Sequence, residues 1–345
     1  MTEKKPNKKK SGLVGKILIG VISTVFLIAI IGAAALWFSW QWLQSEVASD
    51  GPAQSETIIT LPRGASLIAI SSQLEREGVV ENGDLFRAWV TIDGGDRDLR
   101  AGEYAIPARA SILDIYDQLR DGQTLSYPVT VPEGRTSAMI VRILDVSDAL
   151  TGIIEDTPAE GSLLPETYFV QRGTTRQEVL DRMRADQQAL IDQLWPGRAD
   201  NLPFDTPEEA IILASVVEKE TGVASERPLV ASVFVNRLRR GMRLESDPTI
   251  IYGISGGEPL GRGIRRSELD NDQNPYNTYF VNGLPPTPIA NPGRDAIAAV
   301  LNPPDTDYLF FVADGSGGHA FAETYREHQR NVANWRRIER QGGNR

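Results

Sequence analysis

Two glutamates, Glu218 and Glu220, follow directly after a strongly apolar stretch of the chain. Residues 210–217 read AIILASVV, and the two carboxyl groups come next, with Lys219 between them. Such a pattern is typical of a helix end that reaches the solvent. It is also typical of a site that holds a carboxyl group in poorly hydrated surroundings, because desolvation raises the pKa of a carboxyl group and lets it remain an acid at neutral pH.

Helical periodicity does not distinguish the two glutamates. With about 3.6 residues per turn, each glutamate continues an apolar stripe of the helix. Glu218 follows Ile211, Ala214 and Ser215, whereas Glu220 follows Leu213, Val216 and Val217. The two side chains differ by roughly 200° around the helix axis, so we expect at most one of them to face a given cleft. From the residues alone, a helix end at the surface explains the pattern better than a catalytic acid does.

Motifs for several other kinds of site are absent from the sequence. It contains no phosphate-binding GxxxxGK[ST] and no HExxH. His319 and His328 stand nine residues apart in a chain without cysteine, which argues against a zinc site. We therefore expect neither a metal nor a cofactor. A Ser–His–Asp site stays open because its members need not be adjacent in sequence, but no motif indicates one.

Residues 17–40 form a run without a charged side chain and predict a transmembrane helix. As a helix these 24 residues would span about 36 Å, enough to cross a bilayer core. Tryptophans gather at the C-terminal end of the run, and six lysines lie in residues 1–16. This asymmetry predicts a cytoplasmic basic tail and places the chain after Trp42 outside the cytoplasm. A cleaved signal peptide is the alternative, but the run is long for one and lacks a convincing cleavage site.

The charge of the chain is divided unevenly. Residues 1–16 carry six lysines and one glutamate, a net +5, and since the whole chain carries −10, the remainder carries −15. An acidic ectodomain argues against a nucleic-acid partner, whose phosphates need a basic face. Beyond Lys16 the only lysine is Lys219.

The exported part divides into a stalk and two folded regions, which gives an α+β fold class. Residues 41–56 are polar and predict a stalk. Residues 57–126 predict a small βααβ subdomain, with a strand at 57–61, a helix at 66–77, a second helix from Asn82 or Asp84, a strand at 99–107 and a further helix at 111–122. Such a subdomain suits a recognition module, and a plain spacer is the alternative.

Residues 127–345 predict a larger α+β domain. We expect a strand from Tyr127, and helices at 176–195, at 203–222 and, between a Ser225 cap and Gly241, in the next segment. Residues 242–321 are rich in proline and glycine and predict loops, apart from the strand-like YLFFVAD that begins at Tyr308. A polar helix is expected at 323–340, with Trp335 as its main buried side chain.

Long motifs in this larger domain carry a family resemblance. LASVVEKETGVASER is followed by NRLRRGMRLESDPTIIYG (236–253) and by NPYNTYFVNGLPPTPIANPG (274–293). The latter two are dense in asparagine, tyrosine, aspartate and proline, which suits sugar binding by hydrogen bonds and ring stacking. Together with VTVPEG (129–134), EGSLLPETY (160–168) and YLFFVADGSGGHAF (308–321), these segments closely resemble the endolytic murein transglycosylases, the MltG or YceG family.

The resemblance implies an activity and a set of site residues. Members of this family cut peptidoglycan glycan strands internally, between N-acetylmuramic acid and N-acetylglucosamine, and leave 1,6-anhydro ends. Glu218 matches the catalytic glutamate, which implies a structural role for Glu220. Eight further positions match motifs expected to bind substrate, namely Asn236, Arg237, Asp247, Tyr252, Tyr276, Asn277, Tyr279 and His319. Glu166 stands where the family pattern has aspartate. The region 57–126 resembles the family's LysM-like subdomain.

Each of these substrate-binding assignments has a structural alternative. Asn236 suits a core amide that is satisfied by a loop carbonyl as well as it suits a sugar ligand. Asp247 stands before a proline, where aspartate is common as a turn or cap residue. Tyr276 and Tyr279 fit side-chain packing as well as stacking on a sugar. His319 lies among glycines, and the sequence shows no partner that would make it a base.

The resemblance also implies a location and partners. It indicates a single-pass protein of the cell inner membrane, with a cytoplasmic N-terminus and a periplasmic catalytic domain. Its partners would be the membrane, peptidoglycan glycan strands and peptidoglycan synthases, and the enzyme would end glycan elongation as a terminase. The alternative is a catalytically inactive, membrane-anchored peptidoglycan-binding or scaffold protein.

Overall fold

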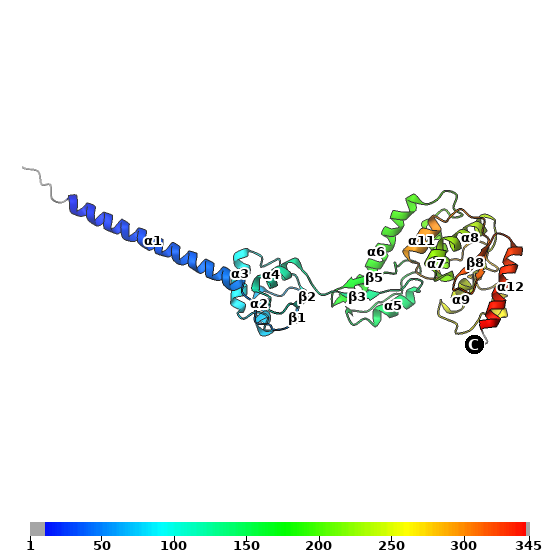
Figure 1. Cartoon of the computed structure of the whole chain (residues 1–345), viewed down its shortest axis with the longest axis horizontal. Coiled ribbons are helices and arrows are strands. Elements are labelled where there is room, and N and C mark those ends of the chain that lie inside the picture. The colour runs from blue at the N-terminus through cyan, green and yellow to red at the C-terminus, as the bar shows by residue number, and fades with distance from the viewer. Residues whose placement is uncertain (1–10, 343–345) are drawn as a thin grey trace, which may run out of the picture. The chain divides into compact units, whose positions relative to one another are not determined.

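The computed structural model describes residues 11–342, which fall into two compact units (Figure 1). The first unit runs to Leu125 and the second begins at Ser126. Both mix helices with short strands, so the predicted α+β class is confirmed. Five of the six lysines of the predicted basic tail lie outside the described residues.

The first unit begins with the long helix α1 (Ser11–Val47). Its segment Lys16–Val47 has a mean hydropathy of 2.7 in its most apolar window, none of which is buried, and is long and apolar enough to cross a membrane. The helix continues into the segment for which the sequence predicts a stalk. Its last residue, Val47, is fully buried in the core of the first unit, and Trp40 stacks on Trp89 with ring centroids 6.2 Å apart.

The rest of the first unit follows the predicted order of elements. Strands β1 (Thr57–Leu61) and β2 (Gly102–Ile106) pair antiparallel, with α2 (Leu67–Arg76) and α3 (Gly83–Asp93) between them in sequence. The helix α4 (Ile112–Asp121) follows β2. Ser66 and Ser111 cap α2 and α4, and Asn82, one of the two predicted starts, caps α3. The apolar faces of these helices close over the two-stranded sheet around the buried side chains of Phe86, Tyr104 and Ile115.

The second unit opens with strand β3 (Tyr127–Thr130), which pairs antiparallel with β5 (Thr167–Val170). Between them lie α5 (Ser137–Asp145) and the short β4 (Leu150–Thr151), which pairs with β6 (Thr174–Thr175). The long helix α6 (Arg176–Leu194) and a 3₁₀ turn, η1 (Trp195–Gly197), follow. Ile140, Leu163 and Tyr168 are at the centre of this part's core.

Three mutually packed helices form the centre of the second unit: α7 (Pro207–Glu220), α8 (Arg227–Arg239) and α11 (Arg294–Leu301) (Figure 1). Thr206 caps α7 in a reciprocal pair with Glu209. The predicted Ser225 cap of α8 is wrong. Residues Ala224–Glu226 form a 3₁₀ turn, η2, and α8 begins with Arg227 and Pro228, because proline is preorganised for the first helical turn.

The region predicted as loops, 242–321, contains more structure than expected. It holds α9 (Asp247–Ser255), α10 (Arg266–Leu269) and α11, and its end forms the hairpin of β7 (Phe310–Ala313) and β8 (His319–Ala322). Helix α12 (Tyr325–Gly342) packs on this hairpin. The sequence misses α9 and α11 because both are short and lie among proline- and glycine-rich segments that predict loops.

Candidate active site

Glu218 lies in the last turn of α7 with only 5% of its side chain exposed. The backbone N–H of Gly293 donates to its Oε2 at 3.0 Å, and Nη2 of Arg227 donates to its Oε1 at 3.2 Å. These donors come from the segment before α11 and from the first residue of α8. Both carboxylate oxygens are therefore held by elements that are far apart from each other in the sequence.

Arg227 connects Glu218 to a second carboxylate. The same Nη2 atom donates to Oε2 of Glu133 at 2.8 Å, and Nη1 lies 3.7 Å from Oδ2 of Asp295. Arg227 is largely buried, whereas the Glu133 side chain is 39% exposed. Burial and the neighbouring charge of Glu218 raise the pKa of Glu133. One guanidinium thus faces three carboxylates, two of which share a single nitrogen.

A turn after β3 encloses the Glu218 side chain. Gly134 in this turn has φ +70°, and a side chain there would meet Cγ of Glu218 at 3.4 Å. Lys219 donates from Nζ to the carbonyl of Gly134 at 3.2 Å and is not paired with Glu220. Burial lowers the pKa of Lys219. The neighbour of Glu218 therefore anchors the turn that covers it.

Glu220 has an entirely different environment. Oγ of Ser246 donates to its Oε1, and the negative charge of Asp247 acts on it. Burial raises the pKa of Glu220 to about 7. Glu218 and Glu220 share no partner among these contacts, which agrees with the prediction that the two side chains point apart.

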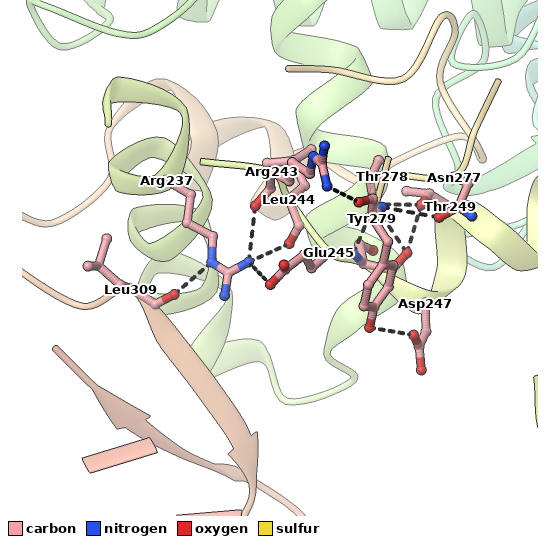
Figure 2. Close-up of polar contacts among 11 residues, drawn as sticks. Arg237, Arg243, Leu244, Glu245, Asp247, Thr249, Asn277, Thr278, Tyr279 and Leu309 are labelled. Atoms are coloured by element: carbon pink, nitrogen blue, oxygen red, sulfur yellow. Dashed lines mark hydrogen bonds and ion pairs between the residues drawn. The ribbon is translucent and has the colours of Figure 1, made fainter. Parts of the chain in front are cut away.

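Three of the predicted substrate-binding residues use their polar atoms inside the protein. Arg237 is buried, and its guanidinium donates to the carbonyls of Leu309, Arg243 and Leu244 and to the carboxylate of Glu245 (Figure 2). Asn236 donates from Nδ2 to the carbonyls of Thr306 and Tyr308. Asn277 is fully buried and donates to the carbonyls of Leu269 and Asn271. These contacts fix the loops around α8 and α9.

Asp247 and Tyr279 form a pair at the start of α9. The phenol of Tyr279 donates to Oδ1 of Asp247 at 2.9 Å (Figure 2). Burial and this carboxylate raise the pKa of Tyr279. Asp247 is the first residue of α9, where a negative charge interacts favourably with the helix dipole. The pair therefore helps to define where α9 begins.

Tyr252 and Tyr276 form an aromatic pair. Their rings meet edge to face, with centroids 4.9 Å apart, and the Tyr276 hydroxyl lies 2.8 Å from Oγ1 of Thr287. Burial raises the pKa of Tyr252 to about 12. Both tyrosines pack against the main core of the second unit and are only partly buried. Each ring thus combines packing with some remaining exposure.

His319 has a partner that the sequence does not reveal. Its Nδ1 lies 2.7 Å from Oε2 of Glu226, and its backbone N–H donates to Oε1 of the same carboxylate at 2.9 Å. Glu226 directly precedes Arg227 at the start of α8, and its side chain makes no capping hydrogen bond to the helix. These contacts attach the β7–β8 hairpin to Glu226, which is next to Arg227, the partner of Glu218.

Comparisons with known proteins identify the family. Residues 59–334 match the YceG-like family, which is most of the chain. The chain belongs to the YceG-like family. It is 30% identical to an endolytic murein transglycosylase of Streptococcus pneumoniae over 91% of this chain and 64% of that relative. It thus spans slightly less than two thirds of the pneumococcal protein.

Two further relatives extend the comparison. An endolytic murein transglycosylase of Bacillus subtilis is 28% identical over 79% of this chain and 82% of that protein. A solved YceG-like protein from Listeria monocytogenes is 28% identical, covers 81% of this chain and 99% of its own, and superimposes with a TM-score of 0.48.

In this YceG-like chain, the immediate neighbours of Glu218 are residues to which the sequence assigned no role. They are Glu133, Arg227 and Gly293, which lie in the motifs VTVPEG, ASER and ANPG. Their presence in those motifs is the feature of the sequence that could have identified them. Only the fold brings them together. Within residues 11–342, no group of three His, Asp or Glu side chains is placed to hold a metal ion.

Proposed function

We propose that this chain is an endolytic lytic transglycosylase that cleaves peptidoglycan glycan strands between N-acetylmuramic acid and N-acetylglucosamine. Membership of the YceG-like family and the activity named for the pneumococcal and Bacillus relatives support this proposal. The observation that carries it is the environment of Glu218, a nearly buried carboxyl group held by donors from two other segments. Such preorganisation suits a group that transfers protons in a fixed geometry.

The reaction needs one carboxyl group that acts twice. Protonated Glu218 gives its proton to the glycosidic oxygen as the bond from that oxygen to the muramyl anomeric carbon breaks. The N-acetyl oxygen of the substrate stabilises the positive charge that develops at this carbon. The Glu218 carboxylate then takes the proton of the muramyl 6-hydroxyl as that oxygen bonds to the anomeric carbon. The product is a 1,6-anhydro ring, and Glu218 regains its proton.

Other residues around Glu218 stabilise its carboxylate, offer surface for the sugar or support the surrounding loops. Arg227 and the Gly293 N–H stabilise the carboxylate that forms after the first proton transfer. Tyr252 and Tyr276 offer partly exposed aromatic surface on which a sugar ring can stack. Asp247 and Tyr279 lie together at the start of α9, and His319 lies on β8 beside Glu226. For Asn236, Arg237 and Asn277 we propose an indirect contribution, because their donors already hold loop carbonyls.

The first unit suits membrane anchoring and glycan binding. Lys16–Val47 has the length and composition of a membrane-spanning helix. We propose a single pass through the cell inner membrane, with the N-terminus cytoplasmic and the second unit periplasmic. The β1–α2–α3–β2 order supports the assignment of residues 57–126 as a LysM-like module. Anchoring would direct cleavage to nascent strands near peptidoglycan synthases, where the enzyme would terminate elongation.

The test uses the purified full chain in detergent with isolated sacculi. Wild-type protein is expected to release 1,6-anhydro-muramyl ends, and Glu218→Gln to lose at least about 100-fold in rate, because the amide cannot donate an acidic proton. Glu208→Gln removes a carboxyl group from the exposed first turn of the same helix and serves as the matched control. Glu218→Gln with wild-type activity would contradict the assignment of Glu218. Sacculus binding without new anhydro ends would favour the inactive scaffold.

A further inference from the structure

Glu133 lies beside Glu218, although it is partly exposed and far from Glu218 in the sequence. It lies in the turn after β3, 85 residues before Glu218, and its Oε2 accepts from the same Nη2 of Arg227 that donates to Glu218. The two carboxylate oxygens are therefore within two hydrogen-bond lengths of each other. Like charges this close interact strongly, so their protonation is coupled.

The position of Glu133 is fixed by packing as well as by charge. A side chain added at Gly293 would meet Oε1 of Glu133 at 1.9 Å, so the carboxyl group of Glu133 lies directly against that glycine. Gly293 is also the residue whose N–H donates to Glu218. Two backbone hydrogen bonds tie the turn to this segment, from Gly134 to the Asn291 carbonyl and from Asn291 to the Arg135 carbonyl.

The first step of the proposed reaction needs a protonated carboxyl group, whereas the donors that hold Glu218 favour a charged one. A guanidinium beside a carboxylate favours the charged form, and the Gly293 N–H acts in the same direction. A second carboxylate on the same nitrogen opposes this effect. Burial and the charge of Glu218 raise the pKa of Glu133. The repulsion between the two carboxylates acts on both of them. The other charged groups around the pair are Asp295, Lys219, Arg135 and Glu166.

We propose that Glu133 is a positioning residue that occupies Arg227 and thereby lets Glu218 keep the proton that it donates to the glycosidic oxygen. This inference rests on the proposed function of Glu218. Glu133 holds one side of the guanidinium and packs on Gly293, so it sets both donors of Glu218 at once. Without the negative charge of Glu133, Arg227 keeps only Glu218 and the mostly exposed Asp295 as carboxylate partners, and its charge acts more strongly on Glu218.

The first test is the pH–rate profile of Glu133→Gln in the full chain in detergent, measured as anhydro ends released from sacculi. We expect the rate at about pH 7 to fall roughly tenfold and the alkaline limb of the profile to move about one unit toward lower pH. Asp295→Asn is the matched control. It removes a negative charge that faces Arg227 from 3.7 Å but is mostly exposed, so its limb is expected to move much less, because solvent screens it.

A second variant displaces Glu133 without removing it. Gly293 has φ −77°, which alanine adopts without strain, and Gly293→Ala keeps the N–H that donates to Glu218. Its methyl group would push the Glu133 carboxylate off Arg227, so the limb should again move toward lower pH. This variant decides the matter if Glu133→Gln does not fold.

The outcomes separate this proposal from the proposed function. An equal loss of rate at every pH, with no movement of the limb in either variant, would show a merely structural role and overturn the inference. A wild-type profile in Glu133→Gln would do the same. If the wild-type chain releases no anhydro ends, or if Glu218→Gln remains active, the proposed function itself fails, whatever Glu133 does.

Discussion

The guanidinium of Arg227 lies 3.2 Å from the carboxylate of Glu218, across the turn that joins α7 to α8. Glu218 stands in the last turn of one helix, and Arg227 is the first residue of the next. Both side chains are almost completely buried. Because a buried charge without a partner is costly, each residue depends on the other for its place in the structure.

Replacing Arg227 by lysine should damage the site more than it damages the fold. A lysine ammonium is a point charge on a flexible stem and cannot reproduce the fork that faces Glu133, Glu218 and Asp295. We expect activity to fall at least about tenfold and the free energy of unfolding to fall by about 1–3 kcal/mol. Anhydro-end release and urea unfolding of the same preparations measure the two effects. Arg239→Lys, on the opposite end of α8, is the control.

Glu220 should make the second unit less stable as the pH rises. Its pKa is raised to about 7 in the folded protein, so the folded state retains this proton at pH values where the unfolded chain has lost it. The associated stability is fully present below the ordinary pKa of a glutamate and is lost as the pH rises through about 7. Thermal unfolding between about pH 5 and pH 8 should show this decline.

Glu220→Gln is expected to flatten that pH dependence, because glutamine accepts the Ser246 hydrogen bond without gaining a charge. The difference between the two proteins at about pH 8 should be on the order of 1–3 kcal/mol. The exposed Glu208→Gln provides the comparison. An unchanged slope in Glu220→Gln would show that another group is responsible.

Arg237→Lys should destabilise the second unit although it preserves the charge. Arg237 donates to three backbone carbonyls and to Glu245 from a buried position, and lysine cannot satisfy these acceptors in the same directions (Figure 2). We expect a loss of about 2–3 kcal/mol in the free energy of unfolding. A variant that lowered glycan affinity at unchanged stability would instead place Arg237 in contact with the substrate.

The Tyr276 ring and its hydroxyl can be tested separately. Tyr276→Phe removes the contact with Thr287 but keeps the edge-to-face pair with Tyr252, whereas Tyr276→Ala removes both. If the ring stacks on a sugar, Phe should raise KM less than about threefold and Ala more than about tenfold, since aromatic stacking contributes on the order of 1 kcal/mol or more. Equal effects of the two changes would assign the contribution to the hydroxyl.

Removing the N-cap of α7 should weaken the fold without affecting the chemistry. Thr206 accepts from the N–H of Glu209, and the Glu209 carboxylate accepts from the N–H of Thr206. Thr206→Ala is expected to lower the free energy of unfolding by about 1 kcal/mol. The cap lies at the opposite end of the helix from Glu218, so anhydro-end release at a temperature where the variant is folded should remain at the wild-type rate.

Many local features of this protein are readable from the sequence because short-range chemistry decides them. Ser66, Asn82, Ser111 and Thr206 begin helices where a capping side chain precedes an apolar repeat. The α+β class follows from the order of these patterns. Segment ends without such chemistry are harder to predict, as the start of α8 shows. The helix α11 is hard to predict because it is short and stands between proline- and glycine-rich turns.

The sequence by itself determined the apolar helix before Glu218, the separation of Glu218 from Glu220 around it, and the motifs of the family. Periodicity could not choose between the two glutamates, since both faces of α7 are buried against other helices. Only the tertiary structure decided that Glu218 meets Glu133, Arg227 and the N–H of Gly293. These groups come from distant segments, and their spacing depends on how α7, α8 and α11 pack, which no local pattern encodes.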